Sequence, residues 1–129
     1  MHRFRISALR ERDSMHIEVE VDINSKQLHD AVMNDSKFWT FAASEWHRLY
    51  SPYTPYKTGM LDNTVVITPG QIEHTVPYAR YQYYGENFHF SKEQHPLASA
   101  KWDQAAEPTQ KPKLIRTLQN YIDSGRLKL

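Results

Sequence analysis

The sequence contains no cysteine, only four glycines and no long apolar run. Without cysteine the chain has no disulfide, no thiolate nucleophile and no thiolate zinc site, and it fits a protein that folds in a reducing compartment. The few glycines form neither the G-x-G-x-x-G nor the G-x-x-x-x-G-K phosphate-binding loop. No apolar run approaches the roughly 20 residues of a membrane helix, and the N-terminal segment lacks a signal-peptide core. These absences predict a soluble protein that makes no contact with a membrane.

Charge is distributed unevenly along the chain, although the net charge is +1. Residues 1–12 carry four arginines and one glutamate, residues 111–129 carry five basic residues and one aspartate, and residues 13–110 carry seven basic and thirteen acidic residues. The length predicts a single domain over residues 1–129, with a basic N-terminal arm at about residues 1–14 and a basic C-terminal helix and tail at about residues 111–129. Basic ends on an acidic body favour contacts with nucleic acid or with neighbouring subunits, unless both ends are ordinary solvated faces.

The first half of the chain predicts a strand followed by a long helix. HIEVEVDI at residues 16–23 alternates apolar and acidic residues, which is typical of a strand with one buried face. From Leu28 to Tyr50 apolar residues recur at spacings of three and four, so this segment predicts an amphipathic helix. Ser25 is the expected N-cap, and Asp35 interrupts the apolar stripe, where the helix could kink or break.

The second half predicts a hairpin and two helices. Residues 63–68 and 71–76 read as strands joined by a tight Pro-Gly turn. A short helix is expected at Leu97–Ala106, ended by Pro108, and a second one at Lys113–Asp123. The predicted fold class is therefore α+β, with a long N-terminal helix packed on a small, mostly antiparallel sheet and with C-terminal helices.

The sequence predicts no enzyme. His89 and His95 share one polar loop with Glu93, but their spacing is not that of H-x-E-x-H or H-E-x-x-H metal sites. No serine lies in a G-x-S-x-G turn, and the acidic residues follow a strand face and helix surfaces rather than forming catalytic pairs. We therefore expect no catalytic residues, no metal site and no cofactor.

A small nucleic-acid-binding module is the alternative that the residues leave open. Basic side chains at both ends could contact phosphates: Arg3, Arg5, Arg10, Arg12, Lys111, Lys113, Arg116, Arg126 and Lys128. The tyrosines of PYARYQYYG, at residues 77–85, could stack on exposed bases. Against this reading, the tyrosine segment is not basic, the first strand is acidic, and no nucleic-acid-reading motif is present.

An ordered series of motifs resembles one family. PYKTGML at residues 55–61 is followed by two short strands, VPYARYQYYGENF at 76–88, HP at 95–96 and Trp102 with two alanines after it. In this order and spacing the series is similar to the small minor capsid and neck proteins of tailed bacteriophages. The resemblance extends over residues 28–121. Lys57 departs from it, because an acidic residue often precedes Thr-Gly in that family.

The resemblance implies a structural virion protein at the head–tail junction, made in the cytoplasm of the host bacterium. It implies a minor capsid or neck protein that takes part in tail completion or forms a tail terminator ring. The implied partners are further copies of the chain in a ring, the head connector or portal on one side, tail proteins on the other, and packaged DNA through nonspecific contacts. Within a helical turn Tyr78, Tyr81 and Tyr84 share about a third of the circumference, so this corner is expected to be part core and part subunit interface. The loop Glu86–Gln94 and the two basic termini are the other expected interface elements.

Overall fold

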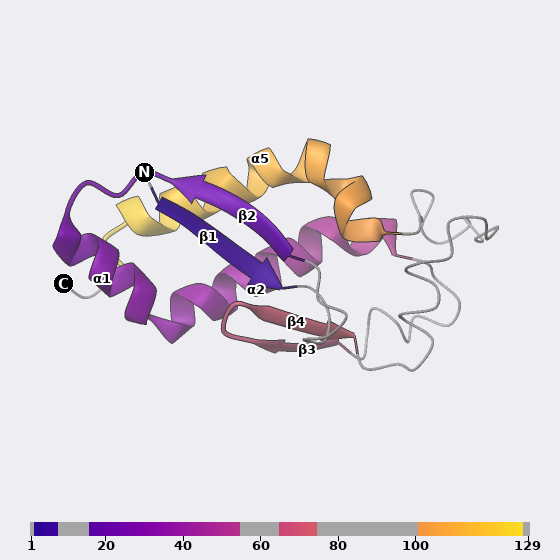
Figure 1. Cartoon of the computed structure of the whole chain (residues 1–129), viewed down its shortest axis with the longest axis horizontal. Coiled ribbons are helices and arrows are strands. Elements are labelled where there is room, and N and C mark those ends of the chain that lie inside the picture. The colour runs from indigo at the N-terminus through magenta and orange to yellow at the C-terminus, as the bar shows by residue number, and fades with distance from the viewer. Residues whose placement is uncertain (1, 8–15, 55–64, 75–100, 128–129) are drawn as a thin grey trace.

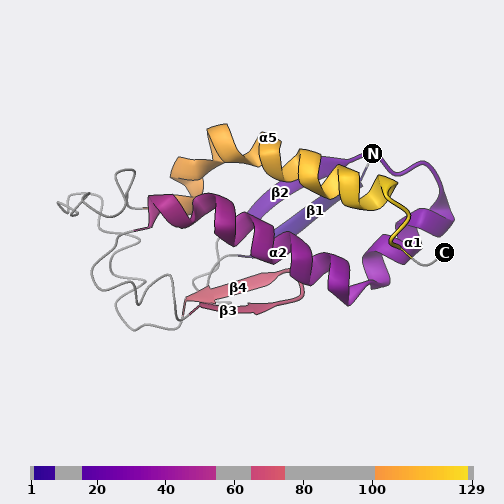
Figure 2. The same cartoon turned by 180° about the vertical axis from the view of Figure 1, so that it is seen from behind.

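The protein has the α+β fold that the sequence predicts, with a four-stranded sheet covered on one face by helices (Figure 1). This computed structural model describes residues 2–7, 16–54, 65–74 and 101–127. The elements in chain order are β1 (His2–Ser7), β2 (His16–Val21), α1 (Lys26–Asn34), α2 (Ser36–Tyr50), the short 3-10 helix η2 (Ser51–Tyr53), β3 (Val65–Thr68), β4 (Gln71–His74) and α5 (Trp102–Asp123). Seen from behind, α2 and α5 lie side by side across the sheet (Figure 2).

The sheet has the strand order β2-β1-β4-β3 and is mostly antiparallel, as predicted. β1 pairs with β2 along its whole length, from His2 opposite Val21 to Ser7 opposite His16. β3 and β4 form an antiparallel hairpin, whereas β1 and β4 run parallel and meet at one residue pair, Ser7 with Gln71. The sheet thus consists of two antiparallel pairs that join at a single point, so packing against the helices must hold the two pairs together.

Residues 2–7, expected in a basic arm, instead form the strand β1 inside the sheet. The register with β2 places Arg3 opposite Glu20 and Arg5 opposite Glu18. Opposite charges at directly opposed positions stabilise an antiparallel pair by about 0.2–1 kcal/mol each. The arginines that suggest an arm in the sequence are therefore matched to the acidic positions of the neighbouring strand.

Pro69-Gly70 forms the predicted tight turn between β3 and β4. Gly70 has a φ of +70°, a left-handed conformation that glycine adopts without strain. A Cβ atom there would lie 3.6 Å from the Trp39 ring, which is ordinary contact, so the φ angle rather than space requires glycine. The N–H of Gly70 donates to the carbonyl of Trp39 at 3.1 Å, which ties the turn to α2. Residues 63–64 and 75–76 of the predicted strands lie outside the described residues.

The helix predicted from Leu28 to Tyr50 is divided into α1 and α2 at Asp35, the residue where the sequence indicated a possible break. Asp35 has an extended backbone, with φ −95° and ψ 100°, and its side chain accepts a hydrogen bond from the N–H of Phe38 at 3.1 Å. It caps α2 in the same way that the predicted cap, Ser25, caps α1. Because a side chain that satisfies a free helical N–H competes with the helix interior, Asp35 breaks the predicted helix.

The Trp39 side chain joins the two helices across this break. Its indole Nε1 donates to the carbonyl of Val32, in the last turn of α1, at 3.0 Å. Its ring packs edge-on against Phe38, with centroids 5.5 Å apart. Together with the bond from Gly70, these contacts connect α1, α2 and the hairpin turn through one residue.

The two predicted C-terminal helices are one helix, α5, which runs through Pro108 and Pro112. The prediction of a break was wrong because both prolines lie on the exposed side of α5. Gln104 and Pro108, whose carbonyls lose their N–H partners, are exposed as well, so water can satisfy them. A buried stripe holds the opposite side: Trp102, Ala106, Leu114, Leu118 and Ile122. This packing outweighs the roughly 3 kcal/mol that a proline costs inside a helix.

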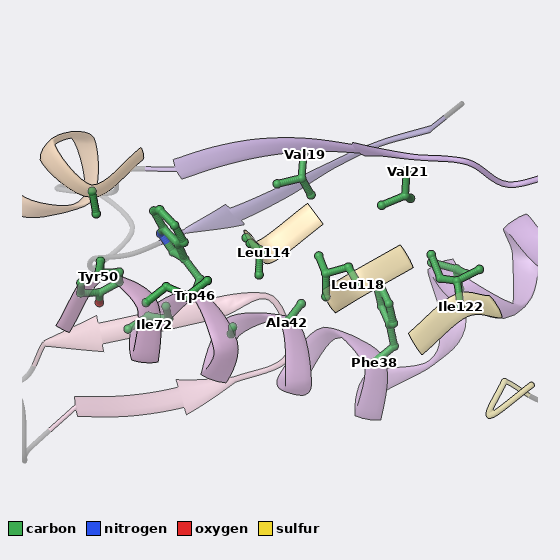
Figure 3. Packing of buried hydrophobic residues seen from close by; sticks show 14 of the residues in the cluster. Val19, Val21, Phe38, Ala42, Trp46, Tyr50, Ile72, Leu114, Leu118 and Ile122 are labelled. Carbon is green, nitrogen blue, oxygen red and sulfur yellow. The ribbon is translucent and has the colours of Figure 1, made fainter. Parts of the chain in front are cut away.

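The core lies between the sheet and the helices α2 and α5 (Figure 3). From the sheet, Val19 and Val21 of β2 face the helical layer, and Ile72 of β4 does so from the hairpin. From α2 the buried side chains are Phe38, Ala42, Ala43, Trp46, Leu49 and Tyr50. Burying a large apolar side chain stabilises the fold by about 1.5–3 kcal/mol, so this layer contributes most of what holds the two strand pairs together.

The end of β2 is bound to α5 through the side chain of Gln119. Its Oε1 accepts from the N–H of Asp22 at 2.7 Å, and its Nε2 donates to the carbonyl of Asp22 at 3.1 Å. A primary amide carries an oxygen that accepts and an NH₂ group that donates, so one side chain can bind both the N–H and the C=O of a backbone residue. Gln119 therefore pairs with the backbone at Asp22 much as a residue of a neighbouring strand would.

Candidate interaction surface

The elements expected at subunit interfaces are the tyrosine stretch, the loop Glu86–Gln94 and the two basic termini. Several features singled out in the sequence lie outside the described residues: the tyrosine stretch at 77–85, the loop Glu86–Gln94, and His89 and His95. The structure does describe the residues on either side of the segment 75–100, which are His74 and Lys101. The contacts of these two flanking residues show where the segment is connected to the described fold.

His74, which precedes residues 75–100, and Trp102, which follows Lys101, lie in one aromatic cluster. We call this cluster the aromatic anchor; its members are Trp46, His47, Tyr50, His74 and Trp102. The ring of His74 lies edge-on to that of Trp102, with centroids 5.5 Å apart. The last residue of β4 and the first residue of α5 are thus packed against each other, so both ends of the segment are held at the same place.

A buried hydrogen bond lies at the centre of the aromatic anchor. The Tyr50 hydroxyl and Nε2 of His74 are 2.7 Å apart, and the two residues are 0% and 3% exposed. A polar group buried without a partner costs about 1–3 kcal/mol, so this pairing removes a penalty for both groups. The edge-on contact of Tyr50 with Trp46, at 5.8 Å between centroids, adds about 0.5–1.5 kcal/mol. The bond joins the end of β4 to the end of α2.

Lys101 enters α5 with a strained backbone, at φ 47° and ψ 51°. A non-glycine residue in this left-handed region costs on the order of 1 kcal/mol or more. The next residue, Trp102, is fully buried in the aromatic anchor, and its packing offsets that cost. The return of the chain into α5 is therefore fixed by the anchor rather than by the local backbone preference.

Sequence reasoning did not identify the aromatic anchor, although one signal for it was present. Ile72 and His74 are two positions apart in β4, so their side chains lie on the same face of the strand, and both are buried. Alternation alone would have placed His74 on the inner face, where a polar partner is required. Nothing in the sequence indicates that the partner is Tyr50, because the two residues are 24 positions apart and belong to different elements.

The two basic termini differ in structure. Arg3 and Arg5 lie in β1, opposite acidic positions of β2. Lys113 and Arg116 lie on the exposed side of α5. Lys111 is half-buried, and its Nζ lies 3.5 Å from Oε1 of Glu107. The C-terminal basic stretch therefore presents charge to solvent, whereas part of the N-terminal one belongs to a strand of the sheet.

The described residues include His, Asp and Glu, the side chains that could hold a metal ion in a chain without cysteine. Among them there is no group of three or more His, Asp or Glu side chains placed to hold a metal ion. An open groove of about 610 Å³ lies beside the break between α1 and α2. It is lined by Gln27, Asp30, Ala31, Asn34, Asp35, Ser36, Lys37, Tyr121 and Arg126. Two acidic and two basic side chains in an open hollow are typical of a solvated surface. No helix in the described ranges is long and apolar enough to span a membrane.

Residues 15–120 match the model of a protein family described as minor capsid protein. The match begins just before β2 and ends in the last turns of α5, so it includes the aromatic anchor and both long helices. The chain belongs to this family. Minor capsid proteins of bacteriophages are structural proteins of the virion, and the resemblance seen in the sequence is confirmed at this level. Searches of curated proteins and of solved structures found no match.

Proposed function

We propose that this minor capsid protein forms part of the connection between the phage head and tail, as one subunit of a homo-oligomeric ring. Its neighbours would be the head connector or portal on one side and tail proteins on the other. The family match supports a structural role in the virion. The finer assignment is supported by the order of the P-x-x-T-G-x-L, P-Y-A, H-P and tryptophan motifs along residues 55–102.

The observation that carries this proposal is the attachment of residues 75–100. Both ends of this segment are fixed at the aromatic anchor, through the Tyr50–His74 bond and the packing of Trp102. A contact segment that is held at both ends loses less conformational entropy when it binds a neighbour. The tyrosine stretch and the loop Glu86–Gln94, which the sequence predicts to be interface elements, both lie between these two fixed points. The segment is therefore suited to repeated contacts with identical subunits in a closed ring.

The alternative, an independent nucleic-acid-binding module, is less well supported. The register of β1 with β2 places two of the four N-terminal arginines opposite glutamates, where opposite charges stabilise a strand pair. An isolated module of this kind would need that charge for phosphates. We therefore propose a structural role and no enzymatic one.

Electron microscopy of particles made by the phage with this gene deleted tests the proposal. We expect DNA-filled heads lying apart from finished tails, and normal virions when the wild-type gene is supplied in trans. A variant with Glu86–Gln94 replaced by a glycine-serine segment of equal length should fail to restore joining. A Lys26→Ala variant, changed at an exposed position of α1, serves as its control and should restore it. Intact virions from the deletion mutant would overturn the proposal.

A further inference from the structure

We propose that the exposed side of α5 contacts the phosphate backbone of double-stranded DNA. We call this surface the cationic face of α5; its residues are Thr109, Pro112, Lys113, Arg116 and Asn120, all exposed. The inference rests on the proposed function, because a ring at the head–tail junction surrounds the path of the DNA and presents the same face once per subunit. It adds the element that meets the DNA and the kind of contact that it makes.

Charge complementarity identifies the partner. The sequence has no acidic residue from Pro108 to Ile122, so nothing on this face neutralises Lys113 and Arg116 along the helix. These two residues are three positions apart, which brings their Cβ atoms within about 5–6 Å of each other on one side of a helix. A lysine and an arginine at this separation can reach neighbouring phosphates of one strand. The hydroxyl of Thr109 and the amide of Asn120 supply further donors for phosphate oxygens.

Three other cations in the described part of the chain, Arg48, Arg126 and Lys111, have partners of their own. Nη2 of Arg48 lies 2.9 Å from the Glu45 carboxylate, and this hydrogen bond raises the pKa of the guanidinium. The guanidinium of Arg126 lies over the Tyr121 ring, 5.3 Å from its centroid. Lys111 is close to Glu107. Lys113 and Arg116 are thus the two neighbouring cations of α5 whose charge is directed outward.

The opposite side of α5 holds the cationic face in a fixed position. Leu114, Leu118 and Ile122 are buried at spacings of four residues, directly across the helix from the exposed positions. A buried stripe of this kind prevents rotation of the helix about its axis. No aromatic or large apolar side chain is exposed on the cationic face to insert between bases. The contact is therefore expected to be independent of DNA sequence, as phosphate contacts are.

An NMR titration of the ¹⁵N-labelled protein with a mixed-sequence DNA duplex tests the inference, because it detects the weak binding expected of one subunit. We expect amide shift changes clustered between Thr109 and Asn120, which shrink as salt is raised from about 50 to about 200 mM. Absence of shift changes at the low salt concentration, or a cluster elsewhere, would overturn the inference. If the double variant described below disrupts ring assembly and the wild type ignores DNA, the face instead binds a neighbouring copy.

Two variants with the same loss of charge provide the comparison. Lys113→Gln with Arg116→Gln should weaken binding about tenfold or more and make the slope of log K against log salt shallower by about 1.8. Lys26→Gln with Lys37→Gln removes two exposed cations from α1 and α2 and should leave both quantities close to wild type. Equal effects of the two pairs would show a response to net charge alone and would contradict the inference.

The outcomes separate this inference from the proposed function. If the deletion mutant fails to join heads to tails but the two charge variants bind DNA equally, only the cationic face is assigned wrongly. If the deletion mutant makes normal virions, the head–tail assignment fails whatever the titration shows. Normal virions from the deletion mutant, together with equal DNA binding by the two charge variants, would remove both proposals.

Discussion

At the scale of single residues, the fold depends on side chains that complete backbone hydrogen bonding where regular elements end. Asp35 caps α2, Trp39 binds the last turn of α1, and Gln119 binds both backbone groups of Asp22. The Trp39 contact joins α1 to α2 and the Gln119 contact joins β2 to α5, whereas the Asp35 cap fixes where α2 begins. Because helix ends and strand ends leave N–H and C=O groups unpaired, such contacts determine where elements stop and which neighbours they face.

The Gln119 contact gives a sharp test at this scale. Gln119→Glu removes the Nε2 donor to the Asp22 carbonyl. It also places a carboxylate beside that carbonyl and beside Asp123, whose Oδ1 lies 3.1 Å from Nε2 of Gln119 in the wild-type protein. We expect the free energy of unfolding to fall by about 1–2 kcal/mol. Asn120→Asp is the control, because it makes the same amide-to-carboxylate change at the next residue, which is exposed. Urea denaturation should show that its free energy of unfolding falls by less than about 0.5 kcal/mol. Equal losses would mean that the amide contact contributes little.

At the scale of elements, the sequence predicted what depends on local periodicity and missed what depends on distant partners. The alternating segment at residues 16–23, the cap at Ser25 and the turn at Pro69-Gly70 were predicted because each is specified by its own residues. The strand β1 was missed: Phe4 and Ile6 do alternate with arginines, but only the register with β2 shows that these arginines face acidic positions.

The prolines of α5 illustrate the opposite error. A rule about local backbone geometry predicted a helix end at Pro108, but a buried stripe that begins at Trp102 and continues to Ile122 keeps the helix intact. The interface elements that the sequence predicts, residues 77–94 and the two basic stretches, stay predictions, and residues 77–94 lie outside the described residues. It did not identify the aromatic anchor, because the Tyr50–His74 bond joins two elements far apart in the chain.

Replacing the prolines tests whether α5 is continuous. Pro108→Ala and Pro112→Ala each restore an N–H donor, to the carbonyls of Gln104 and Pro108, without disturbing a buried side chain. In a continuous helix each change should stabilise the protein by about 1 kcal/mol or more, because alanine is the better helix former. Thermal unfolding followed by circular dichroism measures the gain. If α5 ended at Pro108, neither alanine would be in a helix interior and stability would change little.

At the scale of the whole molecule, α5 closes a core that the earlier elements cannot bury alone. It supplies Trp102 to the aromatic anchor and packs along both α2 and β2. The two antiparallel strand pairs touch each other at one residue pair, so the helical layer provides most of the contact that makes them one sheet. The fold is therefore expected to be cooperative, with no stable part that lacks α5.

Truncation tests this dependence. A chain of residues 1–101 should lack the near-ultraviolet circular dichroism of packed aromatic rings and show no cooperative urea transition, because Trp46, Val19 and Ile72 lose the surface that covers them. A chain ending at Leu127 keeps all of α5 and serves as the control. A cooperative transition in the shorter chain would show that α5 is an addition to an already stable unit.

The position of β1 in the middle of the sheet has a consequence for synthesis in the infected cell. β1 comes from the first residues of the chain, whereas the helix that covers the sheet extends to Asp123. At a translation rate of about 5–20 residues per second, β1 and β2 are made on the order of ten seconds before α5 is complete. During that interval the apolar face of the strand pair has no permanent cover. The yield of this protein should thus depend on host chaperones and on translation speed more than its modest size suggests.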